Sequence, residues 1–238
     1  MNKTQLGKDF QNYYGNIILL GPQGSGKGTL LPFLTILLNL NALGTGDMLR
    51  AIVAKGTKEG IKIKKYMDSG AHVPDEYVVA SVVNTLRNPT NGRYGVIDGF
   101  PRNIMQYNAI RSYISTLIHL NLSDDECMER GLGRVLDEET GEIFNYKKNP
   151  EGIQGLVLDD KGSFVSGYSM ITGNKLIVRS DDTREGLEKR IELYHSTTEP
   201  IINEFDGTLI NLDVSKTPKA IQEQLYQKIM LVFNNTHC

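Results

Sequence analysis

The stretch from Asn16 to Thr29 constrains the fold of this chain more than any other. It reads Asn-Ile-Ile-Leu-Leu-Gly-Pro-Gln-Gly-Ser-Gly-Lys-Gly-Thr, an apolar run followed by a glycine-rich loop with one lysine. The apolar run predicts a buried strand, and the residues from Lys27 onward predict a helix. A glycine-rich loop between a strand and a helix N-terminus can wrap its backbone amides around a phosphate group.

The bare pattern of Gly21, Gly26 and Lys27 is not specific, since three such matches arise by chance in a chain of this length at about the 0.1 level. A flexible turn is the alternative interpretation. A turn alone, however, needs neither the lysine nor the strand before it. The residue after Lys27 is Gly28, and the hydroxyl comes one place later at Thr29, so direct metal ligation by that hydroxyl is less secure.

Composition limits the other classes of function. The 238 residues include 26 basic and 28 acidic side chains, a net charge of −2, which gives no electrostatic case for binding nucleic acid or an anionic membrane. Only Cys127 and Cys238 are present, without a C-x-x-C pair, and residues 1–15 lack the apolar segment of a secretory signal. We therefore expect a reducing compartment, the cytoplasm.

Short apolar runs alternate with helical patterns along the chain, which predicts an α/β fold with a five-stranded parallel sheet flanked by helices. The expected strands are Asn16 to Leu20, Ala42 to Leu43, Tyr94 to Asp98, Leu117 to Leu122 and Thr208 to Val214. The expected helices are Lys27 to Leu40, Gly46 to Lys55, Lys58 to Ser69, Asp75 to Arg87, Asn103 to Ser115, Asp124 to Leu136, Thr183 to Phe205 and Pro218 to Phe233.

Two stretches interrupt this alternation. Residues 45–74 are helical but rich in lysine, which indicates a small helical insertion. Residues 135–176 have no helical period and instead alternate glycines, acidic residues and β-forming residues, as hairpins do. A long segment of this kind in a compact protein is typical of a lid.

Charged residues at the ends of the expected elements suggest phosphate chemistry. Asp98 ends a strand beside the glycine-rich loop, where a carboxylate can hold a water molecule of bound Mg²⁺; taken alone, it could equally cap the turn before Gly99. Arginine is a bidentate phosphate ligand that keeps its proton. The arginines that we single out are Arg50, Arg102, Arg130, Arg134, Arg179 and Arg190, although each taken singly could form only a surface ion pair.

Five blocks of sequence together resemble adenylate kinase, in the order of that family. They are Gly21-Pro-Gln-Gly-Ser-Gly-Lys-Gly-Thr29, Thr45-Gly-Asp-Met-Leu-Arg50, Asp98-Gly-Phe-Pro-Arg102, Arg130-Gly-Leu-Gly-Arg134 and Arg179-Ser-Asp-Asp182, followed by Arg190. The resemblance implies a monomer that transfers phosphate reversibly from MgATP to AMP, giving two ADP. It also implies a P-loop core domain of residues 1–44, 75–134 and 177–238, an AMP-binding helical insertion at 45–74 and a lid at 135–176.

The resemblance also implies a role for each matching residue. The ATP-binding residues would be Gly24, Ser25, Gly26, Lys27, Gly28, Thr29, Arg130 and Arg134, with Arg130 stacked on the donor adenine. The AMP-binding residues would be Thr45, Arg50, Val73, Gly99, Arg102, Gln106, Arg179 and Arg190. The catalytic residues would be Lys27, Arg102, Arg134, Arg179, Arg190, Asp181 and Asp182, with Asp98 positioning hydrated Mg²⁺.

Gln106 bears on the choice of acceptor, because its amide can pair with an adenine edge. The related UMP/CMP kinases usually lack this glutamine, so AMP is favoured over a pyrimidine nucleotide. A UMP/CMP kinase and an AMP kinase that uses GTP remain the alternatives, and a non-catalytic nucleotide-binding relative is a more remote one. The sequence does not determine the donor base.

The expected lid also bears on metal binding. Where zinc-bearing relatives have cysteine pairs, this chain has Asp137 with Thr140 and Ser169 with Thr172. Oxygen side chains at this spacing are poor zinc ligands but can form a hydrogen-bond network. We therefore expect no structural zinc. The lid is longer than usual around residues 149–167, which we interpret as a tolerated loop elongation rather than a partner-binding feature.

Overall fold

The computed structural model describes residues 15–68, 73–179 and 182–235. These residues divide into two compact units. The first unit contains the described residues of 15–21, 25–121 and 194–235, and the second contains those of 22–24 and 122–193. The predicted catalytic residue Asp181 lies outside the described residues.

The first unit alternates strands and helices. Its strands are β1 (Asn16–Leu20), β2 (Asn41–Gly44), β3 (Gly95–Asp98), β4 (Ile114–Asn121) and β10 (Thr208–Asp213). Its helices are α2 (Lys27–Leu38), α3 (Thr45–Ala54), α4 (Lys58–Asp68), α5 (Asp75–Arg87), α6 (Ile104–Ile110), α9 (Ile201–Glu204) and α10 (Pro218–Asn235).

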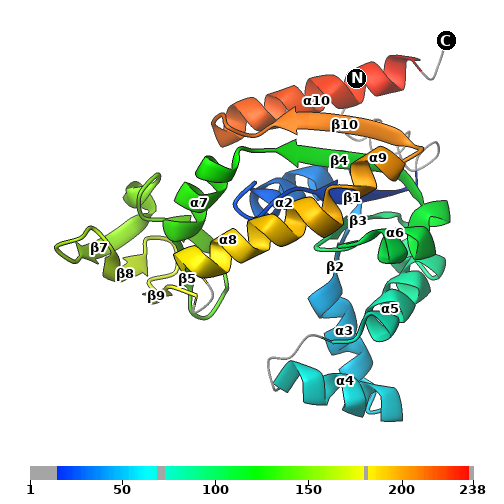
Figure 1. Ribbon diagram of the computed structural model, residues 1–238, viewed down its shortest axis with the longest axis horizontal. Coiled ribbons are helices and arrows are strands. Elements are labelled where there is room, and N and C mark those ends of the chain that lie inside the picture. Colours follow the sequence, from blue (N-terminus) through cyan, green and yellow to red (C-terminus); the bar gives the residue numbers. More distant parts are fainter. Residues whose placement is uncertain (1–14, 69–72, 180–181, 236–238) are drawn as a thin grey trace. The chain divides into compact units, whose positions relative to one another are not determined.

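These strands form one five-stranded sheet in the order β10-β4-β1-β3-β2, and every neighbouring pair is parallel (Figure 1). The predicted five-stranded parallel sheet is therefore confirmed. Because β1 lies at the centre, the loop that follows it emerges between the carboxyl ends of β3 and β4. In open α/β sheets this edge is where ligands bind.

The central strand β1 is buried along its whole length. Its one polar residue, Asn16, is only 4% exposed and uses both ends of its amide. The Asn16 Nδ2 donates to the carbonyl of Tyr113 over 3.0 Å, and Oδ1 accepts from the amide of Gly95 over 2.9 Å. Asn16 thus ties the start of β1 to the segments on both sides of it, with no buried polar atom of its amide left unpaired.

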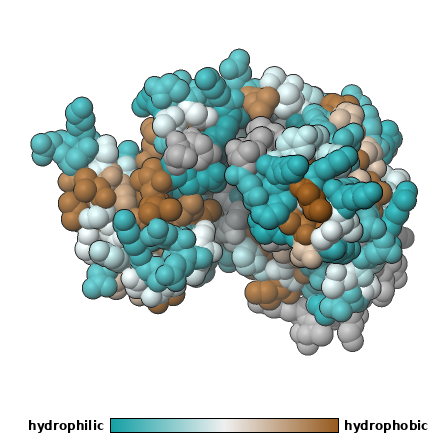
Figure 2. Space-filling view, turned by 90° about the horizontal axis from the view of Figure 1, so that it is seen from below, coloured by the Kyte–Doolittle hydropathy of each residue, from teal (hydrophilic) through white to brown (hydrophobic). Residues whose placement is uncertain are grey.

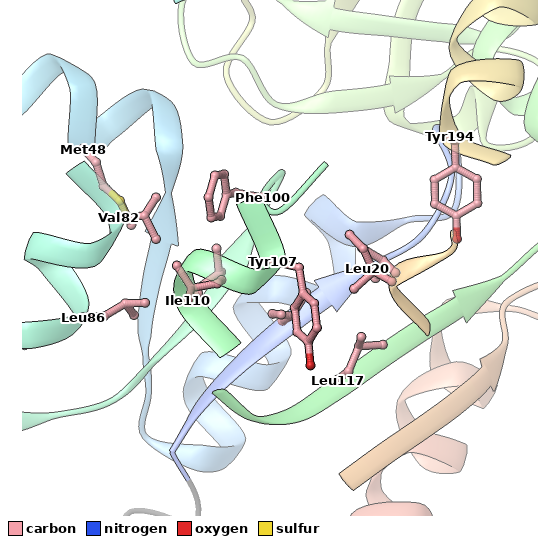
Figure 3. Packing of buried hydrophobic residues seen from close by; sticks show 12 residues of the cluster. Leu20, Met48, Val82, Leu86, Phe100, Tyr107, Ile110, Leu117 and Tyr194 are labelled. Carbon is pink, nitrogen blue, oxygen red and sulfur yellow. The ribbon is translucent and has the colours of Figure 1, made fainter. Parts of the chain in front are cut away.

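An apolar cluster fills the space between the sheet and helices α3, α5 and α6. Ile18, Ile97 and Leu117 supply it from the strands, and Val82 and Ile110 supply it from the helices. Figure 3 shows the members of this cluster directed toward one another. Complete burial of such side chains stabilises a fold by about 1.5–3 kcal/mol each, so this cluster holds helices α3, α5 and α6 against the sheet.

Two predicted boundaries in the first unit are wrong. The helix expected over 103–115 ends at Ile110, and the strand expected from Leu117 begins at Ile114 instead. The pairing of Ile114 with Asn16 extends the parallel ladder toward the start of β1. The gain of ladder hydrogen bonds here outweighs the helical pattern of the sequence, which is the usual way tertiary contacts override local propensity.

The second unit joins two helices to short antiparallel strands. Its helices are α7 (Asp124–Leu132) and α8 (Arg184–Leu193), and its strands are β5 (Arg134–Asp137), β6 (Ile143–Asn145), β7 (Ile153–Leu158), β8 (Phe164–Ser169) and β9 (Leu176–Ile177). The predicted hairpins are confirmed by the antiparallel pairs β5–β6, β5–β9 and β7–β8. The predicted lid, residues 135–176, falls within this unit.

Two predicted helices end early. The helix expected over 124–136 stops at Leu132, because Arg134 pairs with Asn145 as the first residue of β5. A Cβ at the intervening Gly133 would lie 2.5 Å from the Asn145 side chain. The helix expected over 183–205 is interrupted at Tyr194–Thr198 by a π-helical turn and then by Pro200, which has no backbone N–H to continue a helix.

Asp137 is the centre of a hydrogen-bond network in the second unit. Its side chain accepts from the amides of Glu139 and Thr140 over 2.9 Å each and from the Thr172 hydroxyl over 2.5 Å. Asn174 Nδ2 donates to it over 3.1 Å. Asp137 is 1% exposed and Ser169 is fully buried, whereas Thr140 and Thr172 are exposed. Ser169 Oγ accepts from the amides of Ile171 and Thr172. The hydrogen-bond network predicted for these oxygen side chains is therefore present around two buried acceptors.

The network has an electrostatic consequence. The hydrogen bond from Thr172 lowers the pKa of Asp137, and burial opposes this. The amide of Thr140, the side chain of Asn174 and the amide of Glu139 lower it further, so the pKa lies well below the ordinary aspartate value. The carboxylate stays ionised and can act only as an acceptor.

The β7–β8 hairpin carries apolar side chains on its surface. Val157, Val165 and Tyr168 are each about half exposed, and apolar surface is visible on this part of the chain in Figure 2.

Within the described ranges 15–68, 73–179 and 182–235, no helix is long and apolar enough to cross a membrane.

We predict that Asp137→Asn lowers the melting temperature of the protein at pH 7, because the neutral amide loses one acceptor for the donors around it. The contribution of Asp137 is complete above the ordinary aspartate pKa of about 3.9 and is lost as the pH falls through the lowered pKa. The difference in melting temperature between wild type and variant, followed by circular dichroism, should therefore begin to shrink as the pH falls below about 4 and should disappear only below the lowered pKa. The neighbouring exposed variant Glu138→Gln should melt like the wild type, and an equal loss in both variants would contradict the role of the network.

Candidate active site

The glycine-rich loop follows β1 directly, and two of its glycines are required by close packing. A Cβ at Gly21 would lie 2.8 Å from the Ser25 hydroxyl and 2.9 Å from the Leu120 Cβ. A Cβ at Gly24, which has φ +84°, would lie 3.0 Å from the carbonyl oxygen of Cys127. Gly26 precedes α2 with φ 87°, a left-handed conformation that favours glycine. The loop is therefore shaped by residues without side chains.

Lys27 is the first residue of α2, and its side chain folds back over the loop. Its Nζ donates to the carbonyl of Gly21 over 2.7 Å and to the Ser25 hydroxyl over 3.4 Å. The helix thus begins with a positive charge and with backbone amides that have no acceptor inside the helix. This arrangement can attract and hold an anion at the carboxyl edge of the sheet.

Asp98 is the last residue of β3, and the sheet register places it beside Leu19 and Gly44. Its side chain is half-buried, and no described residue forms a hydrogen bond with its carboxylate. The next residue, Gly99, has φ +77°. Asp98 therefore lies on the strand that neighbours β1, at the edge from which the loop emerges.

Several predicted AMP-binding residues lie around Gly99. A Cβ at Gly99 would lie 3.8 Å from Arg102 Nη2 and 3.9 Å from Thr45 Oγ1, so these two side chains approach it together. Arg102 Nε donates to the Gly99 carbonyl over 2.9 Å. The peptide bond between Phe100 and Pro101 is cis. The fold thus brings Thr45 and Arg102 together, although they are far apart in the sequence.

Two further predicted AMP-binding residues lie in or beside the helices α3 and α5. Arg50 is exposed on α3, and a Cβ at Gly46 would lie 3.3 Å from its Nη1. Val73 is partly buried just before α5. Of the predicted ATP-binding residues, Gly28 and Thr29 are exposed in the first turn of α2.

Gln106 is buried, with 4% of its surface exposed. Its Oε1 accepts from the amide of Arg102 over 2.7 Å, and its Nε2 donates to Asp75 Oδ1 over 2.8 Å. Each end of the amide therefore has one partner inside the protein and keeps a further donor or acceptor site. The predicted base-reading residue is held in one orientation by the protein.

In the second unit, Asp182 gathers three side chains. Arg134 Nε and Nη2 donate to its two carboxylate oxygens over 2.7 and 2.5 Å, a bidentate ion pair. Arg190 Nη2 donates over 3.0 Å and Gln23 Nε2 over 3.1 Å. Burial raises the pKa of Asp182, but the hydrogen bonds and charges of Arg134 and Arg190 outweigh this and leave it lowered. Asp182 thus brings together two of the predicted phosphate-binding arginines.

The other arginines of this unit are placed differently. Arg130, at the end of α7, donates from Nη1 to the carbonyl of Gly24 over 3.3 Å, so it reaches the loop backbone. Arg179 is exposed in the segment after β9.

Sequence reasoning missed three residues that position this site. Gln23 lies inside the recognised loop pattern but donates to Asp182, and Asn103 caps α6 through a bond from the amide of Gln106 over 2.8 Å. Asp75 joins Asn103 and Gln106. The signal for Asn103 was its place directly before a helical run, which is typical of an N-cap; contacts as distant in sequence as those of Gln23 and Asp75 leave no local signal.

No group of three or more His, Cys, Asp or Glu side chains that could hold a metal ion occurs among the residues that the structure describes. The expectation of a lid without structural zinc stays a prediction.

We predict that Asp182→Asn lowers the free energy of unfolding by about 2 kcal/mol, because Arg134 and Arg190 lose a buried charged acceptor. Urea unfolding at pH 7, followed by circular dichroism, measures this loss. Asp160→Asn, an exposed aspartate in the turn between β7 and β8, is the matched control and should unfold like the wild type. If the two variants are equally stable, the ion pairs of Asp182 contribute nothing.

Comparison with known proteins agrees with this geometry. The family model described as adenylate kinase matches residues 19–209. The adenylate kinase of Vanderwaltozyma polyspora is 35% identical over 215 residues, which cover 86% of this chain and 91% of that protein. Adenylate kinase 4 of Oryza sativa subsp. japonica is 34% identical over 223 residues, which cover 90% of this chain and 86% of that protein. The chain that carries this loop and these arginines therefore belongs to the adenylate kinase family.

Proposed function

We propose that this protein transfers the terminal phosphate of ATP to AMP reversibly and with Mg²⁺, giving two molecules of ADP. The observation that carries the proposal is the loop at the end of β1, where Lys27 begins α2 and its side chain reaches back to the Gly21 carbonyl. The relatives named adenylate kinase support the same reaction. In this reaction an oxygen of the AMP phosphate bonds to the terminal phosphorus of ATP, and the bond from that phosphorus to the bridging oxygen of ADP breaks.

On the donor side, Lys27 and the amides of residues 24–29 would hold the phosphates of ATP. Arg130 would stack on the donor adenine, and Arg134 would neutralise charge on the donor phosphates. Phosphoryl transfer depends mainly on positioning and charge neutralisation, which arginine and lysine supply without losing a proton.

On the acceptor side, Arg50 and Arg102 would bind the AMP phosphate, and Arg179 and Arg190 would neutralise the transferring group. Thr45, Val73, Gly99 and Gln106 would surround the base and sugar. Asp182 would orient Arg134 and Arg190, as its hydrogen bonds to both arginines support, and we propose the same kind of role for Asp181.

The residues around Asp98 fit a hydrated magnesium ion. A half-buried carboxylate without a partner among the described residues is an oxygen ligand of the kind that Mg²⁺ prefers, either directly or through water. When bound, the ion would supply positive charge that offsets the negative charge of the ATP phosphates. Asp98 would hold one of its water molecules.

We propose three further properties. Residues 1–44, 75–134 and 177–238 would form the core domain, residues 45–74 the AMP-binding insertion and residues 135–176 the lid. The protein would act as a monomer with ATP, AMP and ADP as its partners, without nucleic acid or membrane. It would work in the cytoplasm, in keeping with two cysteines and no C-x-x-C pair.

A UMP/CMP kinase or an AMP kinase that uses GTP is the second candidate. Gln106 favours AMP, because its amide can both donate to and accept from an adenine edge. A non-catalytic relative is disfavoured, since a protein that only binds nucleotide would not need all six arginines together with Lys27.

We predict that the purified protein with ATP and Mg²⁺ converts AMP to ADP with a kcat/KM at least about tenfold above that for UMP or CMP. Direct chromatographic detection of each nucleoside diphosphate measures this preference, and replacement of ATP by GTP tests the donor. A preference for a pyrimidine nucleotide would contradict the proposed function.

We also predict that Lys27→Met lowers kcat by roughly a hundredfold or more, because a charge that stabilises the transferring phosphate is lost. Its melting temperature should stay near that of the wild type. Lys219→Met removes an exposed lysine from α10 and should keep full activity. Normal turnover by Lys27→Met would show that the loop is not the donor site.

A further inference from the structure

The start of α5 carries a carboxylate that binds two amide side chains of another segment. Asp75 Oδ1 accepts from Gln106 Nε2 over 2.8 Å, and Asp75 Oδ2 accepts from Asn103 Nδ2 over 3.1 Å. Each carboxylate oxygen therefore serves a different amide. The three residues lie in the first unit and join α5 to the N-terminus of α6.

The opposite end of each amide is also occupied. Gln106 Oε1 accepts from the amide of Arg102 over 2.7 Å. Asn103 Oδ1 accepts from the amide of Gln106 over 2.8 Å and so caps α6. Both side-chain amides thus bind a backbone N–H with their oxygen and the Asp75 carboxylate with their nitrogen.

This pattern permits only one orientation of each amide. An ionised carboxylate can only accept hydrogen bonds and a backbone N–H can only donate. If Gln106 turned its amide over, its NH₂ group would face the N–H of Arg102 and its oxygen would face the carboxylate of Asp75. Both bonds would be lost in a buried place, where unpaired polar groups are costly.

The orientation matters because adenine and the 6-oxopurines present opposite donors and acceptors at positions 1 and 6 of the same edge. Gln106 keeps one N–H and one oxygen lone pair beyond its internal bonds. A glutamine amide pairs with adenine by accepting from the N6 amino group and donating to a ring nitrogen. Hypoxanthine has an oxygen in place of the amino group and a hydrogen on N1, so it presents the reverse pattern and suits an amide that is turned over.

We propose that Asp75 is a positioning residue for acceptor selectivity, which holds the Gln106 amide in the orientation that accepts adenine and rejects 6-oxopurines. The inference rests on the proposed function, in which Gln106 meets the base of the acceptor. Asp75 itself does not touch the nucleotide in this role. It acts only through the amide that it orients.

A structural role for Asp75 makes a different prediction. The carboxylate also lies in the first turn of α5, where a negative charge stabilises a helix, and it links two helices. A loss of helix stability would lower activity with every acceptor alike. It would not change the ratio between two acceptors that differ only at positions 1 and 6 of the purine.

The test is Asp75→Asn, assayed with AMP and with IMP as acceptors and ATP as donor. An asparagine must direct its NH₂ group at either Asn103 or Gln106, so the orientation of Gln106 is no longer enforced. We expect the ratio of kcat/KM for AMP to that for IMP to fall about tenfold through a higher KM for AMP. The KM for ATP should stay within about twofold of the wild type.

Glu76→Gln is the matched control. It removes one negative charge from the same turn of the same helix, is exposed, and forms no hydrogen bond with Gln106. Its AMP-to-IMP ratio should equal that of the wild type. If Glu76→Gln changes the ratio as much as Asp75→Asn does, the charge of the turn and not the orientation of the amide sets selectivity, and the proposal is overturned.

A double-mutant cycle separates the positioning role from the structural role. In a Gln106→Ala background, Asp75→Asn should change the AMP-to-IMP ratio by less than about twofold, since the amide it positions is gone. An undiminished effect of Asp75→Asn in that background overturns the proposal. Should Asp75→Asn fail to fold, Asp75→Ala removes the acceptors without adding a donor and should lower the ratio in the same way.

The proposed function is tested separately by the wild type. A wild-type protein that does not phosphorylate AMP refutes the proposed function itself. A wild-type protein that prefers AMP, together with an Asp75→Asn variant that keeps the same AMP-to-IMP ratio, refutes only the role of Asp75.

Discussion

The close packing around Gly21 and Gly24 is the constraint on which the site depends. A side chain at Gly21 would meet Ser25 and Leu120, and one at Gly24 would meet the backbone of Cys127. Gly21 therefore packs against β4 within the first unit, and Gly24 packs against α7 within the second unit. The loop leads directly into the N-terminus of α2, where an anion can bind, and the Lys27 side chain reaches back to the Gly21 carbonyl.

Three buried or half-buried aspartates organise the rest in the same physical way. Asp75 accepts hydrogen bonds from the side-chain amides of Asn103 and Gln106. Asp137 accepts from a turn and from the side chains of Thr172 and Asn174. Asp182 accepts from two arginines and from Gln23. An ionised carboxylate has no hydrogen to donate, so each group that bonds to it must direct an N–H or O–H at it and is held in that orientation. The lowered pKa values of Asp137 and Asp182 express the same preference for the charged form. The chain thus uses carboxylates to fix the orientation of the groups around them.

Much of this fold follows from local sequence patterns. The parts that do not are decided by contacts between residues that are distant in the sequence. Strand β1, its loop and Asp98 at the end of β3 could be predicted because an apolar strand and a glycine-rich turn are signals within a few residues. The early end of α6 and the short α7 could not, since pairing of Ile114 with Asn16 and of Arg134 with Asn145 decides them. Likewise, Gln106 could be singled out by resemblance to the family, but the bonds that orient it come from Asp75, 31 residues away in the sequence.

The ion pairs of Asp182 also bear on how arginines can serve a phosphate. Arg134 donates two N–H groups to Asp182, and its side chain is only 14% exposed. Its guanidinium is therefore held in place before a ligand binds. Ordering a free arginine side chain costs about 1.5–2 kcal/mol of conformational entropy, and an arginine already held avoids most of that cost when an anion binds. A guanidinium has five N–H donors, so the bidentate pair leaves donors for a phosphate oxygen. In the role proposed for Arg134, the carboxylate would weaken the attraction of the guanidinium for phosphate but would fix its geometry. Positioning supplies much of the rate of phosphoryl transfer, so this exchange would favour the proposed reaction.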